Sequence, residues 1–332
     1  MKNEQGAKIK GKEGRKSVVI YGNCHTAIIA QMLETCREFN EKYYIIPTKR
    51  IQEIKDPKEL YEDCYSQCDV FIHQSIRLNN RYGEEYASEN IIARLKPGCR
   101  VISIPNVYHL PLCFFPQYSD AQELRRGGVT YFFRDSIIDS HLGRPFKLAE
   151  LVKRDYEDPG LYNKESIVAA FDAFVDKVRR REKDWDIKVS DFILKNYRSH
   201  QLFYDPNHPT NFFLNYIASE ILKILINYNV DDSRSLKIDS CLDSIEMPVC
   251  KAVVEALQLN WNNRVVRKSM PHTNRLGCNM NLSNYVYQYM SCVWIKRKCP
   301  KSTKIISRLF WTLNTIVFYY HLTFNHFCKK TK

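Results

Sequence analysis

The chain has 332 residues, of which 44% are hydrophobic and 26% are charged, and its formal net charge is +13. This length and apolar content are sufficient for one large domain, or one domain with a helical extension, and they exclude an intrinsically disordered chain. A basic excess attracts polyanions such as nucleic acid, anionic lipid or phosphorylated small molecules, without distinguishing among them.

The 12 cysteines indicate reduced thiols rather than a disulfide framework. A secreted, disulfide-rich domain is usually shorter and follows a signal peptide. Residues 1–15 are instead polar and charged, with no apolar stretch. We therefore expect a cytoplasmic protein. Cys64 and Cys68 have no second pair at zinc-site spacing, so we expect no metal.

From residue 17 onward, short apolar runs alternate with helical patterns. The predicted strands are 17–21, 43–46, 70–73 and 101–104, and the predicted helices between them are 26–39, 57–65 and 84–95. Alternation at this spacing is typical of βαβ units, which build a parallel sheet flanked by helices in an α/β fold. Such sheets bind ligands beyond the carboxyl ends of their strands.

The second half of the chain is predicted to be irregular and rich in helices. The predicted helices are 165–185, 187–196 and 211–228. We divide the chain into a disordered basic tail (1–15), an α/β catalytic domain (16–230) and a helical C-terminal extension (231–332). The aromatic segment 309–328 of this extension contains asparagines and histidines, which oppose insertion into a bilayer. We expect a buried or surface-lying helix there, with peripheral membrane contact as the alternative.

Cys24 stands at the tip of the first predicted strand-to-helix turn, after Gly22 and Asn23 and before His25. Backbone N–H groups at a helix N-terminus are unpaired, and the helix dipole there favours a thiolate. The same N–H groups can stabilise an oxyanion beside the sulfur. On the turn alone, however, an inert small residue is the better interpretation of Cys24.

Asp205 and His208 enclose a proline and an asparagine just before the helix predicted at 211–228. The proline favours a turn, and a turn can bring the carboxylate back to the imidazole. A carboxylate, a histidine base and a nucleophile on another segment form a triad that is recognised by geometry rather than by chain order. Taken alone, His208 is equally well explained as a loop residue or a helix cap.

Asn106 follows the fourth predicted strand and completes a known layout. A nucleophile on the first turn, a later asparagine and a late Asp-x-x-His resemble the SGNH (GDSL-like) hydrolases. In that family a serine occupies the position of Cys24, and the asparagine helps to bind the oxyanion. The resemblance implies an SGNH- or flavodoxin-like core.

A more extensive resemblance runs from residue 17 to 226. Its motifs are Gly22-Asn23-Cys24, Asp69 to Gln74, Ile104 to Tyr108 and Asn207 to Thr210. In this order they resemble the WcbI-like polysaccharide-biosynthesis acetyltransferases. The resemblance implies an acyltransferase that takes coenzyme A or acetyl-CoA as co-substrate and modifies a sugar or glycan. That family usually has glutamine where this chain has His25, which makes His25 a candidate second base or specificity residue.

These resemblances suggest roles for individual residues. Catalytic roles are expected for Cys24, His208, Asp205 and Asn106, and cofactor contacts for Gly22, Asn23, His25, Gln74, Arg77 and Tyr108. Either Cys24 forms an acyl-thioester, or His208 activates the sugar hydroxyl for direct attack. One alternative is a thiol-dependent esterase with the same residues. Another is a basic protein that binds nucleic acid or membrane without catalysis, although no nucleic-acid-binding signature is present.

Overall fold

The computed structural model describes residues 14–61, 63–108, 110–126, 129–142, 148–228, 236–238, 242, 246–261, 265–267, 279–283, 285–286, 289–290 and 292–293. The predictions for the aromatic segment 309–328, for most of the extension 231–332 and for all but the last two residues of the tail 1–15 lie outside this part of the chain.

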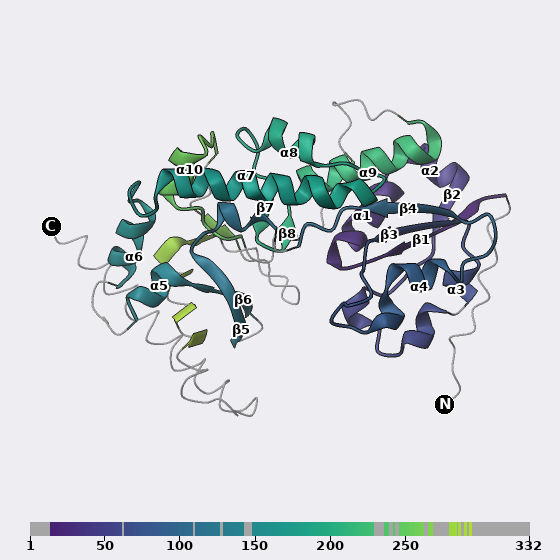
Figure 1. The fold of residues 1–332 in the computed structure, drawn as a ribbon, viewed down its shortest axis with the longest axis horizontal. Coiled ribbons are helices and arrows are strands. Elements are labelled where there is room, and N and C mark those ends of the chain that lie inside the picture. The colour runs from purple at the N-terminus through teal and green to yellow at the C-terminus, as the bar shows by residue number, and fades with distance from the viewer. Residues whose placement is uncertain are drawn as a thin grey trace.

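A four-stranded parallel sheet with the order β2-β1-β3-β4 forms the core of the first half (Figure 1). The strands are β1 (Lys16–Tyr21), β2 (Tyr43–Ile45), β3 (Val70–Gln74) and β4 (Arg100–Ile104). All four predicted strands and the α/β class are therefore confirmed. Because β1 lies between β2 and β3, the strand order switches at β1, which is where ligands bind in open parallel sheets.

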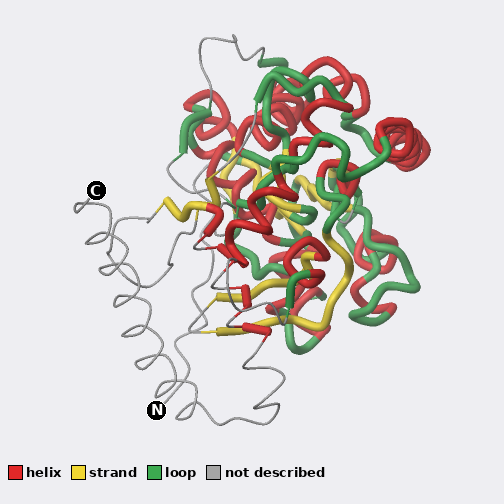
Figure 2. Tube along the Cα trace, turned by 90° about the vertical axis from the view of Figure 1, so that its left-hand side faces the viewer, coloured by secondary structure: helices red, strands yellow, loops and turns green. Residues whose placement is uncertain are grey.

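Alternate side chains of the strands enter two hydrophobic cores on opposite faces of the sheet. On one face, Ile20 and Ile72 pack with α1 and α9; on the other, Val19 and Phe71 pack with residues of α3 and α4. The helices are α1 (Cys24–Glu34), α9 (Asn211–Ile226), α3 (Asp63–Ser66) and α4 (Ser88–Ile92). A view at right angles shows helices on more than one side of the strands (Figure 2).

The predicted helices of the first half are placed correctly but are shorter than expected. The predicted helix 26–39 consists of α1 and α2 (Arg37–Lys42). It breaks because the Thr35 hydroxyl donates to the Met32 carbonyl at 2.7 Å and Asn40 Nδ2 donates to the Glu34 carbonyl at 2.6 Å. The predicted helix 57–65 contains a 3-10 turn at Pro57–Leu60 before α3, and the predicted helix 84–95 contains one at Glu84–Tyr86 before α4. A further 3-10 turn, Ile51–Glu53, precedes the first of them.

The region that follows β4 holds a β-hairpin that was not predicted from the sequence. Strands β5 (Tyr118–Arg126) and β6 (Val129–Asp135) pair antiparallel and adjoin α5 (Ser136–Ser140) and α6 (Leu148–Tyr156), whereas α10 (Lys251–Ala256) packs against the long helix α7 (Lys164–Arg181) (Figure 1). The signal was present, because two glycines precede the β-favouring run Val-Thr-Tyr-Phe-Phe. Helix α7 runs from this region toward the sheet.

Smaller elements complete the described chain. They are the 3-10 turns Pro111–Phe114 and Glu182–Asp184, helix α8 (Ser190–Asn196) and strands β7 (Phe203–Asp205), β8 (His208–Pro209), β9 (Val265–Arg267) and β10 (Asn279–Asn281). Described residues on both sides of position 230 share one core, and the Met247 N–H donates to the Tyr204 carbonyl at 2.8 Å. The domain boundary at 230 stays a prediction. Within the described chain, no helix has the length and apolar character needed to cross a membrane.

Candidate active site

Cys24 is the first residue of α1 and lies just beyond the carboxyl end of β1. Its side chain is a half-buried free thiol. Asn23 caps the helix, because its side chain accepts from the His25 N–H at 3.0 Å and its carbonyl accepts from the Thr26 hydroxyl at 2.7 Å. As the first helical residue, Cys24 has an N–H with no acceptor inside the helix, so this group can bind an oxyanion.

Gln74, at the end of β3, is buried against the turn that carries Cys24. Its Oε1 accepts from the Asn23 N–H at 2.9 Å, and its Nε2 donates to His25 Nδ1 at 3.2 Å and to the Pro105 carbonyl at 3.3 Å. A Cβ atom on Gly22 would lie 2.4 Å from Gln74 Oε1. Position 22 therefore needs glycine, because only glycine lets the ends of β1 and β3 approach this closely.

Asp205 and His208 lie on either side of the tight turn between β7 and β8. Asp205 Oδ1 accepts from the N–H groups of Asn207 at 2.6 Å and of His208 at 3.0 Å, and its Oδ2 accepts from His208 Nδ1 at 2.7 Å. The predicted turn and the predicted approach of carboxylate to imidazole are both confirmed. Asp205 is buried, whereas His208 keeps partial exposure.

The His208 ring also faces Cys24. Burial lowers the pKa of His208, but the charge of Asp205 and its hydrogen bond, followed by the Cys24 side chain, raise that pKa to about 10. His208 is therefore protonated at neutral pH, with the thiol on one side and the carboxylate on the other. The structure thus brings together three of the four residues that were predicted to be catalytic.

His25 is fully enclosed, and both of its ring nitrogens are paired with the protein. Nε2 lies 2.9 Å from the Asn207 carbonyl oxygen, and Nδ1 lies 3.2 Å from Gln74 Nε2. Burial, and then the charge of His208, lower the pKa of His25 to about 4. With no lone pair directed at substrate, His25 is not a second base in this structure. Cofactor contact by His25, Gln74 or the flanking Gly22-Asn23 stays a prediction.

Asn106 lies at the same edge of the sheet as Cys24. It follows Pro105, and its Oδ1 accepts from the Tyr108 N–H at 3.3 Å. Burial raises the pKa of Tyr108. The charge of Arg81 lowers this pKa, and the Cys24 side chain raises it. Tyr108 therefore lies near the thiol. No hydrogen bond joins Asn106 to Cys24 in the described chain, so the oxyanion role of Asn106 stays a prediction.

Several cations border this edge. Arg77 is exposed in the loop after β3, and burial together with the charge of Arg77 lowers the pKa of Arg181 at the end of α7. The Arg181 guanidinium lies 5.4 Å from the centre of the Trp185 ring. Arg50 also interacts electrostatically with Cys24. Neither Arg50 nor Arg181 is recognisable from the sequence as a site residue, because only the tertiary fold brings them to this edge.

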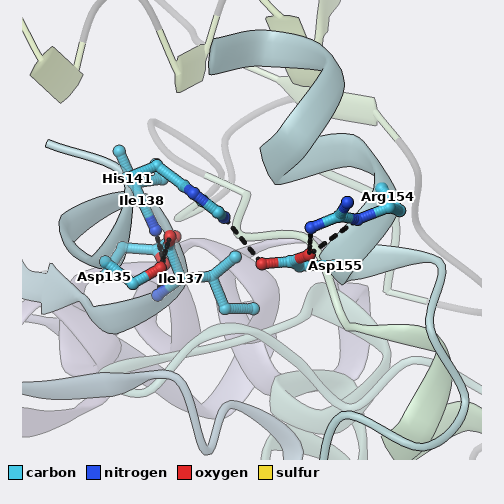
Figure 3. Close-up of polar contacts among 7 residues, drawn as sticks. Asp135, Ile137, Ile138, His141, Arg154 and Asp155 are labelled. Carbon is cyan, nitrogen blue, oxygen red and sulfur yellow. Dashed lines mark hydrogen bonds and ion pairs between the residues drawn. The ribbon is translucent and has the colours of Figure 1, made fainter. Parts of the chain in front are cut away.

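A second histidine–aspartate pair lies in the other half of the molecule (Figure 3). His141 Nε2 is 2.7 Å from Asp155 Oδ2, and Arg154 lies 3.3 Å from Asp155 Oδ1. In the described chain no thiol or hydroxyl group is hydrogen-bonded to His141, so this pair lacks the nucleophile that Cys24 provides in the first. Nor do the described residues place three histidine, cysteine or acidic side chains where they could hold a metal ion.

The chain is similar to a known family and to a solved structure. Residues 17–226 match the family described as polysaccharide biosynthesis enzyme WcbI. The solved structure is that of WcbI, a polysaccharide biosynthesis enzyme, in a native form without a disulfide bond between coenzyme A and one of its cysteines. The superposition of the two structures has a TM-score of 0.65 at 22% sequence identity. It covers 89% of this chain and 93% of that chain, and it supports the fold. No curated protein is significantly similar in sequence.

Proposed function

Because the chain belongs to the WcbI family of polysaccharide biosynthesis enzymes, we propose that it transfers an acyl group, most simply acetyl, from a coenzyme A thioester to a sugar or polysaccharide hydroxyl. The arrangement of Cys24, His208 and Asp205 carries the proposal. A thiol, an imidazole beside it and a buried carboxylate are the groups that covalent acyl transfer uses. The solved WcbI structure, described as a native form without a disulfide bond between coenzyme A and a cysteine, supports a coenzyme A donor.

The protonation of His208 favours a covalent route over direct transfer. A protonated imidazole cannot accept a proton from the sugar hydroxyl, but it stabilises a thiolate at Cys24. The Cys24 sulfur attacks the thioester carbonyl, and the resulting oxyanion accepts a hydrogen bond from the Cys24 N–H, with Asn106 as a second donor. Collapse of this intermediate breaks the bond to the coenzyme A sulfur, which takes the proton from His208.

The second half-reaction restores the starting state. His208, now neutral, accepts the proton of the sugar hydroxyl as the oxygen attacks the acyl-thioester on Cys24. Collapse of the second intermediate releases the sugar ester, the Cys24 thiolate and the protonated His208. Asp205 keeps the imidazole in one orientation throughout, because its Oδ2 holds His208 Nδ1 at 2.7 Å.

The cations at the edge of the sheet suit the donor. Coenzyme A carries a diphosphate and a phosphomonoester, and arginine binds such groups through charge-assisted hydrogen bonds. Arg77 and Arg181 come from different elements and are near enough that the charge of one affects the other. In the described chain neither arginine side chain forms a salt bridge with a carboxylate, which leaves both guanidinium groups able to bind phosphate.

The test is to measure release of free coenzyme A from acetyl-CoA with and without a glycan acceptor. We expect release that depends on the acceptor and is abolished by Cys24→Ala. Cys99→Ala is the matched control, because Cys99 is also a half-buried thiol but precedes β4, at the opposite edge of the sheet. Substantial transfer by Cys24→Ala would exclude the covalent route. Equal release without acceptor would instead show a hydrolase. Absence of coenzyme A binding, with salt-sensitive binding of RNA or DNA, would contradict the proposal.

A further inference from the structure

His25 joins two segments that lie far apart in the chain. Its Nε2 is 2.9 Å from the carbonyl oxygen of Asn207, 182 positions away, and its Nδ1 is 3.2 Å from Gln74 Nε2. The residue is 1% exposed, so these partners are its polar environment. His25 therefore links the helix that begins at Cys24 to the turn that carries His208.

The hydrogen bonds of Gln74 determine which nitrogen of His25 carries the hydrogen. Gln74 Oε1 accepts from the Asn23 N–H, so Gln74 Nε2 faces the Pro105 carbonyl and His25 Nδ1. A carbonyl can only accept, and the second hydrogen of Gln74 Nε2 goes to His25 Nδ1, which is therefore unprotonated. The single ring hydrogen is on Nε2, where it is donated to the Asn207 carbonyl.

Asn207 transmits this contact to the base. Its N–H donates to Asp205 Oδ1 at 2.6 Å, and the His208 N–H donates to the same oxygen at 3.0 Å. The turn is therefore held on one side by its carbonyl, through His25, and on the other by its N–H groups, through Asp205. The His25 and His208 ring centroids are 6.5 Å apart with the ring planes at 70°, so His25 packs edge-on against the base.

We propose that His25 is a positioning residue whose neutral imidazole, oriented by Gln74, holds the β7–β8 turn so that the His208 ring stays against Cys24. The inference builds on the proposed function, because it assigns His25 a part in preparing Cys24 for acyl transfer. The low pKa of His25, which burial and the charge of His208 hold at about 4, keeps the imidazole neutral at physiological pH.

Two substitutions separate the two hydrogen bonds of His25. The side-chain nitrogen of glutamine reaches the position of histidine Nε2, so His25→Gln keeps a donor for the Asn207 carbonyl. Asparagine is one carbon shorter and reaches only the position of Nδ1, so His25→Asn keeps contact with Gln74 and loses the bond to Asn207. His141→Gln is the matched control, since His141 is another buried histidine paired with an aspartate, Asp155, outside the site.

The readout is the rate at which iodoacetamide alkylates Cys24 at pH 7, followed by peptide mapping, with Cys99 as an internal reference. This rate reports how well the His208 imidazolium stabilises the thiolate and requires neither acyl donor nor acceptor. We expect His25→Asn to slow alkylation of Cys24 by about tenfold or more while Cys99 is unchanged. His25→Gln should restore the rate to within about threefold of wild type, and His141→Gln should not change it.

The inference is overturned if His25→Asn and His25→Gln both alkylate like wild type, or if the Cys99 rate changes in parallel, which would indicate a general loss of packing. If the asparagine variant fails to fold, His25→Leu replaces it, because leucine fills similar volume without hydrogen bonds, and the same slow rate is expected. If His25→Asn slows alkylation of Cys24 but the wild-type protein transfers no acyl group, only the proposed function is contradicted. Normal alkylation of the asparagine variant in an active enzyme would remove only the role of His25.

Discussion

Asp205 and Asp135 are two buried aspartates with the same local geometry. In each, Oδ1 accepts two backbone N–H groups of the residues that follow, at 2.6 and 3.0 Å for Asp205 and at 3.0 and 3.2 Å for Asp135 (Figure 3). The two sites differ at Oδ2. Asp205 accepts from the His208 imidazole at 2.7 Å, whereas Asp135 accepts from the Tyr156 hydroxyl at 2.6 Å and the Tyr285 hydroxyl at 3.3 Å.

This difference shows what turns a structural carboxylate into part of a reactive site. Burial raises the pKa of Asp135 to about 6, and the hydrogen bonds from Tyr156 and from the backbone only partly oppose it. A hydroxyl brings no charge to offset a buried carboxylate. The partner of Asp205 is an imidazole that becomes positively charged when protonated, and the same ring also faces Cys24. The same backbone motif therefore serves stability in one region and chemistry in the other.

The largest expected difference between the two sites is in turnover. Asp205→Asn removes the carboxylate that orients His208, so we expect acyl transfer to fall by about a thousandfold to ten-thousandfold, as when an orienting aspartate is replaced in a catalytic triad. Asp135→Asn should leave turnover per folded molecule within about twofold, because Asp135 touches none of the proposed reacting groups. Steady-state rates on variants checked by circular dichroism decide this. Similar losses in both variants would remove the distinction.

A second prediction concerns stability in acid on the His208 side. His25 stays neutral in the folded protein down to about pH 4, but it binds a proton near pH 6.5 once unfolded. The unfolded state is therefore increasingly favoured as the pH falls from 6.5 to 4. We expect wild type to lose about 2.5 kcal/mol of unfolding free energy relative to His25→Gln across this interval. Urea unfolding at several pH values measures it, and parallel pH dependences would contradict it.

The Asp135 side should show the opposite sign and a smaller effect. Its pKa is about 6 in the folded protein and 3.8 in the unfolded chain, so the folded state holds the proton more tightly. Stability should therefore fall as the pH rises from about 4 to 6. The expected loss over this interval is about 2 kcal/mol relative to Asp135→Asn, which has no carboxyl group to titrate at this position. The same urea series tests this, and a difference that does not vary with pH would contradict it.

The sequence predicted those features that have a local cause. The four strands were visible as short apolar runs, and the approach of Asp205 to His208 was visible because a proline-containing turn lies between them. The hydrogen bonds by which His25 holds the turn that carries His208 could not be predicted. The partners of His25 lie 49 and 182 positions away, and contacts between residues so distant in the chain leave no periodic pattern. For the same reason the sequence did not reveal the pairing of His141 with Asp155.

The central claim is that Cys24 carries the acyl group, and the most direct test is to look for it there. The protein is mixed with acetyl-CoA without acceptor, quenched in acid within milliseconds to seconds, and mapped by mass spectrometry. We predict one acetyl group on the Cys24 peptide, none on the Cys99 peptide, and loss of the Cys24 adduct when the glycan acceptor is added. Acceptor acetylation at full rate with Cys24 unmodified at every time point would contradict the account.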